Sequence, residues 1–159
     1  MKKEKMNDKG FSLVELIIVI AIMAVLVVVL APQYLKYVEK SRNSTDVSNA
    51  TEVVTALQVY AADPDADPAF AKDYEFDVAV NASGTASTVT AGAAATALDE
   101  AAIKIADLQC KSKTNWASYN IHGKILENGS IEFTYTAKDA NGTAVTAFSD
   151  AMTGKKASN

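Results

Sequence analysis

The sequence predicts an α+β protein in which a long N-terminal helix packs on a small antiparallel β-sheet. An unbroken apolar run covers residues 16–31, and between residues 47 and 61 apolar side chains recur every three or four positions, as on one face of a helix. Apolar and polar residues alternate on both sides of Asn128-Gly129, a dipeptide typical of tight hairpin turns. The length of 159 residues fits one such domain.

The apolar run predicts a membrane-spanning helix. Residues 16–31 contain only Leu, Ile, Val, Ala and Met, and the whole segment 11–35 is about as long as a helix that crosses a bilayer. Four lysines precede it within residues 1–10, which favours a cytoplasmic N-terminus and an exported remainder. Because Ala31-Pro32 is a poor site for ordinary signal peptidase, we expect the segment to stay on the chain as an anchor.

A short motif leads directly into the apolar run. It reads Gly10-Phe11-Ser12-Leu13-Val14-Glu15, and Glu15 is the one acid at the start of the apolar segment. An ionised carboxylate in hydrocarbon is costly unless it is paired, so Glu15 is a candidate functional residue. The motif and its basic leader resemble the class III signal of type IV pilins. The resemblance covers residues 2–42, about a quarter of the chain, and departs from many major pilins at Ala24, where they carry a Gly.

The resemblance implies a processing site and an assembly site. A prepilin peptidase would cut after Gly10 and methylate the new N-terminus, Phe11. Residues 1–10 would then be a leader peptide, residues 11–35 a transmembrane and filament-core helix, and residues 36–159 a globular head that includes the amphipathic half of the helix. In the filament, Glu15 would pair with the N-terminal amine of the adjacent subunit and so set the register. Pro32 lacks a backbone donor and would let the helix kink or unwind locally.

The function that this resemblance implies is a structural subunit of a type IV pilus, polymerised through its N-terminal helix into a surface filament. Its partners would be further copies of itself, the prepilin peptidase, the membrane before assembly and, indirectly, the assembly ATPase and its membrane platform. The subunit would wait in the cytoplasmic membrane and then join an extracellular pilus, with roles in adhesion or twitching motility both compatible. Two alternatives stay open: a minor pilin or pseudopilin of a secretion or DNA-uptake system, and a membrane-anchored binding domain that never polymerises.

One long helix is expected from about Ser12 to Ala62, because Asp63-Pro64 cannot continue it. Its second half should face the sheet with an apolar stripe made of Val47, Ala50, Val54, Leu57 and Ala61, and Glu39 can pair with Arg42 one turn later. Three Asp residues within 63–67 have the spacing that begins a calcium loop. The glycine and the distal Glu of such a loop are missing, so we expect a solvated turn.

The rest of the chain predicts short strands and a second helix. We expect strands at 76–80 and, weakly, at 88–90, and a helix at 96–108 that is capped by Thr96. Residues 119–126 and 131–135 should form a hairpin around Asn128-Gly129, with a bulge at Gly123. A second turn, Asn141-Gly142, should lead to a third strand through Val145 and Phe148.

Composition argues against several other functions. The net charge of −4 becomes −6 once residues 1–10 are removed, so nucleic acid is not expected as the main partner, and Lys111 and Lys113 should be solvated surface. Cys110 is the only cysteine, which rules out an intrachain disulfide and suggests a buried small residue. His122 is the only histidine, and no catalytic, cofactor-binding or metal-binding motif accompanies it. We therefore expect neither an enzyme nor a cofactor or metal.

Overall fold

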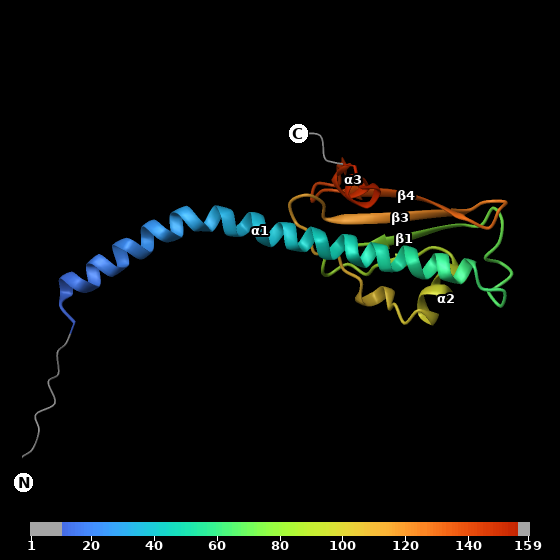
Figure 1. Cartoon of the computed structure of the whole chain (residues 1–159), viewed down its shortest axis with the longest axis horizontal. Helices are drawn as coiled ribbons and strands as arrows, with labels where there is room; N and C mark the ends of the chain where they lie inside the picture. Colours follow the sequence, from blue (N-terminus) through green and yellow to red (C-terminus); the bar gives the residue numbers. More distant parts are fainter. Residues whose placement is uncertain (1–10, 156–159) are drawn as a thin grey trace, which may run out of the picture. The chain divides into compact units, whose positions relative to one another are not determined.

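A computed structural model of the chain describes residues 11–155 and confirms the α+β class (Figure 1). A long helix, α1, is followed by a five-stranded antiparallel sheet and two short helices. The elements are α1 (Leu13–Ala61), β1 (Glu75–Val80), β2 (Thr88–Val89), α2 (Gly92–Glu100), a 3-10 turn η1 (Ile105–Asp107), β3 (Ser118–Ile125), β4 (Ile131–Lys138), β5 (Ala144–Val145) and α3 (Ala147–Thr153). The chain divides into two compact units, one up to Val38 and one from Glu39.

Helix α1 begins and ends within one residue of its predicted limits. It continues through Pro32 without unwinding, and the missing N–H of Pro32 costs one backbone hydrogen bond. From Leu13 to Leu35 its large apolar side chains are between 46% and 74% exposed. The helix is long and apolar enough to cross a bilayer, with a mean hydropathy of 3.4 over its most apolar eighteen residues.

The sheet of the head has the strand order β2-β1-β3-β4-β5, with every neighbouring pair antiparallel. The predicted hairpin is confirmed, because β3 and β4 pair along their full length and Gly129 takes the left-handed conformation (φ 78°) in the turn. The predicted bulge at Gly123 is wrong, since Gly123 lies in continuous register opposite Phe76 on β1 and Phe133 on β4. Glycine is required there for space: a Cβ would lie 2.1 Å from Cζ of Phe76.

The core of the head lies between the sheet and the second half of α1. The side chains that α1 buries are Asp46, Ala50, Val53, Leu57 and Tyr60. They pack with the inward-facing residues of β1 and β3, which include Phe76, Val78, Val80, Tyr119, Ile121 and Ile125. The predicted stripe was therefore wrong at three positions, where the buried residue comes one place earlier in the chain. Residues 47, 54 and 61 are only partly buried, and residues 46, 53 and 60 are buried in their place. The reason is that an acid, Asp46, begins the buried face, so a count of apolar residues alone places the stripe one step too far along.

The helix predicted at 96–108 has different limits. Helix α2 ends at Glu100, because Ala102 takes a positive φ of 58° and its amide bonds back to Asp99 O. Thr96 lies inside the helix rather than at its cap, and its hydroxyl donates to Gly92 O (3.2 Å). The start of the helix is instead capped by the hydroxyl of Tyr74, which accepts the amides of residues 93 and 94. A cap that comes from a distant residue leaves no local sequence signal.

The C-terminal part differs from the predicted strand at one residue. The Asn141-Gly142 turn leads into β5 as expected, but Phe148 lies in helix α3. Its ring is fully buried and stacks on Tyr119 with the ring centres 4.3 Å apart.

The Asp-rich segment 63–68 forms turns in which Asp63 and Asp67 accept backbone amides two residues later. This is the local geometry of Asx turns.

Candidate functional site

The start of α1 is built by a reciprocal cap between Ser12 and Glu15. The Glu15 carboxylate (Oε2) accepts the backbone N–H of Ser12 at 2.8 Å, while the Ser12 hydroxyl accepts the N–H of Val14 at 3.3 Å. This is the capping-box arrangement, in which the third helical residue reaches back to the residue that begins the helix. Glu15 thus has one fixed donor inside its own chain, and its carboxylate remains exposed.

The predicted processing and assembly residues fall in different places. Gly10 lies outside the described residues. Phe11 is 92% exposed and lies directly before the cap residue Ser12, and Glu15 lies in the first turn of the helix. Pro32 lies seventeen residues after Glu15, which is about 25 Å along a helix. Phe11 and Glu15 therefore form one local site, and Pro32 acts on the backbone elsewhere.

A second site, which the sequence interpretation missed, lies on the head. Asp46 of α1 is completely buried and accepts four hydrogen bonds from the irregular segment 110–116 that precedes β3. Its Oδ1 accepts the amide of Lys111 (2.7 Å), and its Oδ2 accepts the amide of Ser112 (2.9 Å), the indole N–H of Trp116 (2.9 Å) and the thiol of Cys110 (3.4 Å). Each donor is thereby satisfied by a charged acceptor, the stronger kind of hydrogen bond.

Glu39, two turns before Asp46, holds the adjacent part of the same segment. Its Oε1 accepts the Ser112 hydroxyl (2.7 Å) and the amides of Lys113 (2.8 Å) and Thr114 (2.9 Å), while the expected Arg42 partner lies 3.6 Å from its other oxygen. Burial acts to raise the pKa of Glu39, but these hydrogen bonds together outweigh it and lower the pKa to about 2. We call Glu39 and Asp46, together with segment 110–116, the carboxylate clasp.

The clasp explains the behaviour of Cys110 and the lysines beside it. Cys110 is buried, as predicted, and burial together with the nearby charge of Asp46 raises the pKa of its thiol to about 12. The thiol therefore stays protonated and donates to Asp46. Lys111 and Lys113 expose their side chains, also as predicted, but their backbone amides bind the two carboxylates. A signal was present in the sequence: Asp46 precedes Ala50, Val53, Leu57 and Tyr60 by helical steps, which places an acid on the buried face.

The outer face of the sheet carries a smaller polar group. Asp77 Oδ1 accepts the side-chain amide of Asn120 at 2.7 Å and lies 3.2 Å from Nδ1 of His122. His122 is half-buried on this face, and the residue opposite it on β4 is Thr134. Within residues 11–155, no three His, Cys, Asp or Glu side chains gather closely enough to hold a metal ion.

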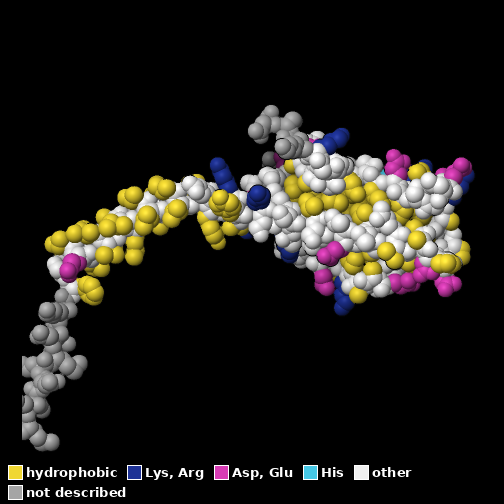
Figure 2. Space-filling model, in the orientation of Figure 1, with side chains coloured by type: hydrophobic (Ala, Val, Ile, Leu, Met, Phe, Trp, Pro, Cys, Tyr) yellow, Lys and Arg dark blue, Asp and Glu magenta, His cyan; other side chains and the backbone are white. Residues whose placement is uncertain are grey.

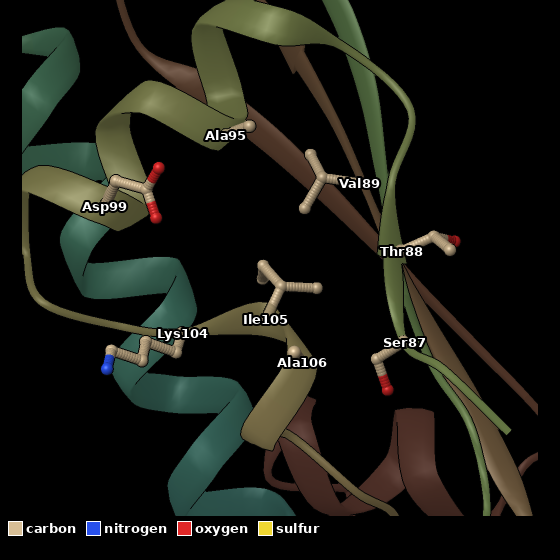
Figure 3. Close-up of a pocket in the computed structure, with 8 residues that line it drawn as sticks. All are labelled: Ser87, Thr88, Val89, Ala95, Asp99, Lys104, Ile105 and Ala106. Atoms are coloured by element: carbon tan, nitrogen blue, oxygen red, sulfur yellow. The ribbon is translucent and has the colours of Figure 1, made fainter. Parts of the chain in front are cut away.

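A hollow of about 610 Å³ lies between β2, α2 and η1 (Figure 3). Val89 and Ile105 point into it from opposite sides, and Asp99 and Lys104 lie at its rim. The hydroxyl of Ser87 is already used within the fold, because it donates to Leu108 O at 2.6 Å and accepts the amide of residue 81. The lining therefore offers one carboxylate, Asp99, and one amine, Lys104, beside apolar side chains. Its described residues include no nucleophile paired with a general base.

The N-terminal segment that contains Phe11 and Glu15 resembles known proteins. Residues 5–31 match the family model described as the prokaryotic N-terminal methylation motif. The chain is 37% identical over 59 residues to a type IV major fimbrial protein FimA of Dichelobacter nodosus, and 39% identical over 54 residues to another protein of that name from the same organism. The predicted resemblance to type IV pilins is confirmed. These relatives are named as fimbrial proteins, and their names describe no enzymatic activity.

The likeness to pilins is limited in length. The first match covers 37% of this chain and 38% of the fimbrial protein, so the chain spans well under half the length of the curated relatives it matches. No solved structure matches the chain. The N-terminal pilin motif thus comes from sequence likeness, whereas the clasp and the rest of the head come from the structure.

Proposed function

We propose that this chain is a type IV pilin, a structural filament subunit that is processed between Gly10 and Phe11 and polymerised through the first half of α1. The observation that carries the proposal is an apolar helix surface that is exposed within residues 11–155, with an acid, Glu15, near its start. Figure 2 shows hydrophobic side chains covering this part of the helix. A helix that is apolar on every side must be surrounded by lipid or by other apolar helices. In a filament, repeated contacts with neighbouring copies supply the second environment.

Glu15 has the capacity for the role that the pilin family implies. Its Oε2 accepts one amide within the chain, and a carboxylate offers about four acceptor positions in all. Cleavage after Gly10 would give Phe11 a free amine, the kind of cation that pairs with a carboxylate in an apolar surrounding. The cap fixes the Glu15 side chain in advance, so a neighbour's amine would meet an oriented acceptor. Pairing would neutralise both charges and favour one axial register among copies.

The proposal is tested by two substitutions of Glu15. Glu15→Ala removes both the cap and the charge, whereas Glu15→Gln keeps an acceptor for Ser12 and removes only the charge. We expect both variants to be inserted and processed but to form no filaments on electron micrographs of sheared surface material. Glu52→Gln, an exposed position on the head half of α1, is the matched control and should assemble normally. Normal fibres from Glu15→Gln would show that the charge is not what assembly requires.

Processing is tested separately by mass spectrometry of the mature chain. We expect a methylated N-terminus at Phe11. Gly10→Val should leave the longer form, because a bulky side chain then occupies the residue before the cut. An intact Met1 in the wild-type chain would contradict processing and favour a membrane-anchored domain that does not polymerise.

The matched relatives are named major fimbrial proteins, which favours a major over a minor subunit.

A further inference from the structure

Strand β4 has an open edge. On one side, β3 pairs with all of β4 from Ile131 to Lys138. On the other side, β5 pairs only with Ala137 and Lys138. Within residues 11–155, the stretch 131–136 therefore has a neighbouring strand on one side only (Figure 1). Helix α3 packs against β4 next to β5, with the ring centres of Phe148 and Tyr135 6.4 Å apart. A free edge of this length is a template for a further strand.

The peptide groups that point to this free edge can be assigned. Alternate residues of an antiparallel strand direct their N–H and C=O groups to opposite edges. Asp139 directs its N–H toward the β5 side, where it donates to Thr143 O at 2.9 Å. By the same alternation, Ile131, Phe133 and Tyr135 direct their peptide groups to the open edge. Within residues 11–155, no strand pairs with these three peptide groups, so this edge offers them as donors and acceptors.

The side chains along the edge suit pairing. Ile131, Phe133 and Tyr135 are half-buried on the inner face, where the rings of Phe133 and Tyr135 are nearly parallel (9°) with centres 6.4 Å apart. The head shows hydrophobic area at its surface (Figure 2). The intervening residues on the outer face are Glu132, Thr134 and Thr136. Proline and lysine, which commonly block edge strands, are absent from 131–136, and Glu132 is its one charge.

We propose that the open edge of β4 binds β4 of a second copy of the chain, antiparallel, with Phe133 opposite Phe133. In this register Ile131 lies opposite Tyr135 of the second copy, so the three free residues of each strand are matched with one another. Apolar side chains meet apolar ones on the inner face, and Glu132 lies opposite Thr134 on the outer face. The two sheets become one continuous sheet through a self-complementary contact.

The neighbouring registers are less favourable. A shift that centres the contact on Glu132 places two like charges directly opposite each other, which is destabilising. A shift that centres it on Thr134 requires the peptide group of Ala137, which already pairs with Val145 of β5. A register shifted by one residue would bring outer-face side chains of one copy opposite inner-face side chains of the other. Glu132 would then lie among the aromatic rings. Of these registers, only the one centred on Phe133 pairs the peptide groups of residues 131, 133 and 135 without placing like charges opposite each other.

This contact differs in kind from the contacts of the proposed function. Growth of a helical filament uses repeated heterologous contacts, whereas the β4 contact is isologous and closes on itself. It is therefore a second mode of self-association, carried by the head. It is measured on the full-length chain extracted in detergent, without filaments, so a failure of filament assembly leaves this test intact.

The charge test uses two substitutions at one exposed position. Thr134→Lys places a cation opposite Glu132 of the second copy at two symmetric positions, and Thr134→Glu places an acid there. We expect Thr134→Lys to tighten dimerisation and Thr134→Glu to weaken it, with dissociation constants about tenfold or more apart by analytical ultracentrifugation. Thr88→Lys and Thr88→Glu, on β2 at the opposite edge of the sheet, are matched controls and should match the wild type.

A disulfide test reads the register directly. Residues 132 and 134 of the two copies lie directly opposite in the proposed register, within disulfide reach, whereas two copies of residue 132 lie on a diagonal of about 7–8 Å. A mixture of Glu132→Cys and Thr134→Cys chains should therefore cross-link, and each chain alone should do so poorly. Wild type, whose Cys110 is buried, should stay uncross-linked. Equal cross-linking in all samples, equal effects of Lys and Glu at 134, or no self-association of the wild type would overturn the proposal.

Discussion

The two halves of helix α1 share one backbone but find their packing partners in opposite ways. In the first half, every large apolar side chain from Leu13 to Leu35 is exposed, and the proposed function gives these side chains lipid or other copies as partners. In the second half, five side chains from Asp46 to Tyr60 are buried against the chain's own sheet. A helix with one apolar face and one polar face packs that apolar face on the core of its own domain. A helix that is apolar on all sides needs apolar surroundings on every side.

The charged residues of the two halves follow the same division. Among the described residues, the Glu15 carboxylate accepts one hydrogen bond, from the amide of Ser12, and it lies exposed at the start of the helix. Asp46 is fully buried, and internal donors surround both of its oxygens. The first carboxylate is exposed, as the proposed pairing with another copy requires, and the second is fully buried. Substitutions in the second half should therefore change the stability of the head, and substitutions in the first half should change assembly.

The largest effect on stability is expected from Asp46→Ala. The change leaves the amides of Lys111 and Ser112 and the indole of Trp116 buried without an acceptor. We expect a loss of about 3–5 kcal/mol in the free energy of unfolding. Trp116 is the only tryptophan and lies in the clasp, so its fluorescence during denaturant unfolding of the full chain in detergent reports the head.

Glu52→Ala is the control for this experiment, because Glu52 lies on the same half of the helix but is exposed. It should change stability by no more than about 0.5 kcal/mol. Equal stability of Asp46→Ala and Glu52→Ala would contradict the assignment of the clasp as the main polar link between the helix and segment 110–116.

Elements with a local pattern were predictable from the sequence, and elements that depend on distant residues were not. The limits of α1, strand β1 and the Asn128-Gly129 hairpin follow from periodicity and turn chemistry, and the structure confirms them. The cap of α2 comes from Tyr74, and Gly123 is required by a ring on a neighbouring strand. Neither contact is local in sequence, so the limits of α2 and the supposed bulge were predicted wrongly.

The candidate sites divide in the same way. The N-terminal motif is contiguous in sequence and was predicted, although the Ser12–Glu15 cap was not considered. The clasp joins residues 39 and 46 to a segment more than sixty residues later. The acceptors could be suspected from the place of Asp46 on the buried face, but their donors are mostly backbone amides, which every residue except proline carries. Only the fold identifies which amides these are.

The second-largest effect on the free energy of unfolding is expected when Leu is replaced by Ala in the second half of α1, and the same substitution in the first half is the comparison. Leu57 is fully buried in the core of the head, and Leu26 is 52% exposed in the first half. We expect Leu57→Ala to lower the free energy of unfolding of the head by about 3 kcal/mol, because it leaves a cavity among packed side chains. Leu26→Ala should leave unfolding of the head unchanged and weaken only filament formation. A similar loss of head stability from both variants would show that the two halves are not independent.

The smallest effect concerns Glu39, whose contribution depends on pH. Its pKa is lowered from the ordinary 4.5 to about 2, so the folded head favours the ionised form. This stabilisation is fully present above about pH 4.5 and is lost as the pH falls toward 2. We expect Glu39→Gln to cost about 1–3 kcal/mol at neutral pH, because an amide is a weaker acceptor than a carboxylate for three donors. Unfolding curves of both chains between pH 7 and pH 2 should converge as the acid is protonated. A difference that stays constant over this range would mean that the shape of Glu39, rather than its charge, holds segment 112–114 on the helix.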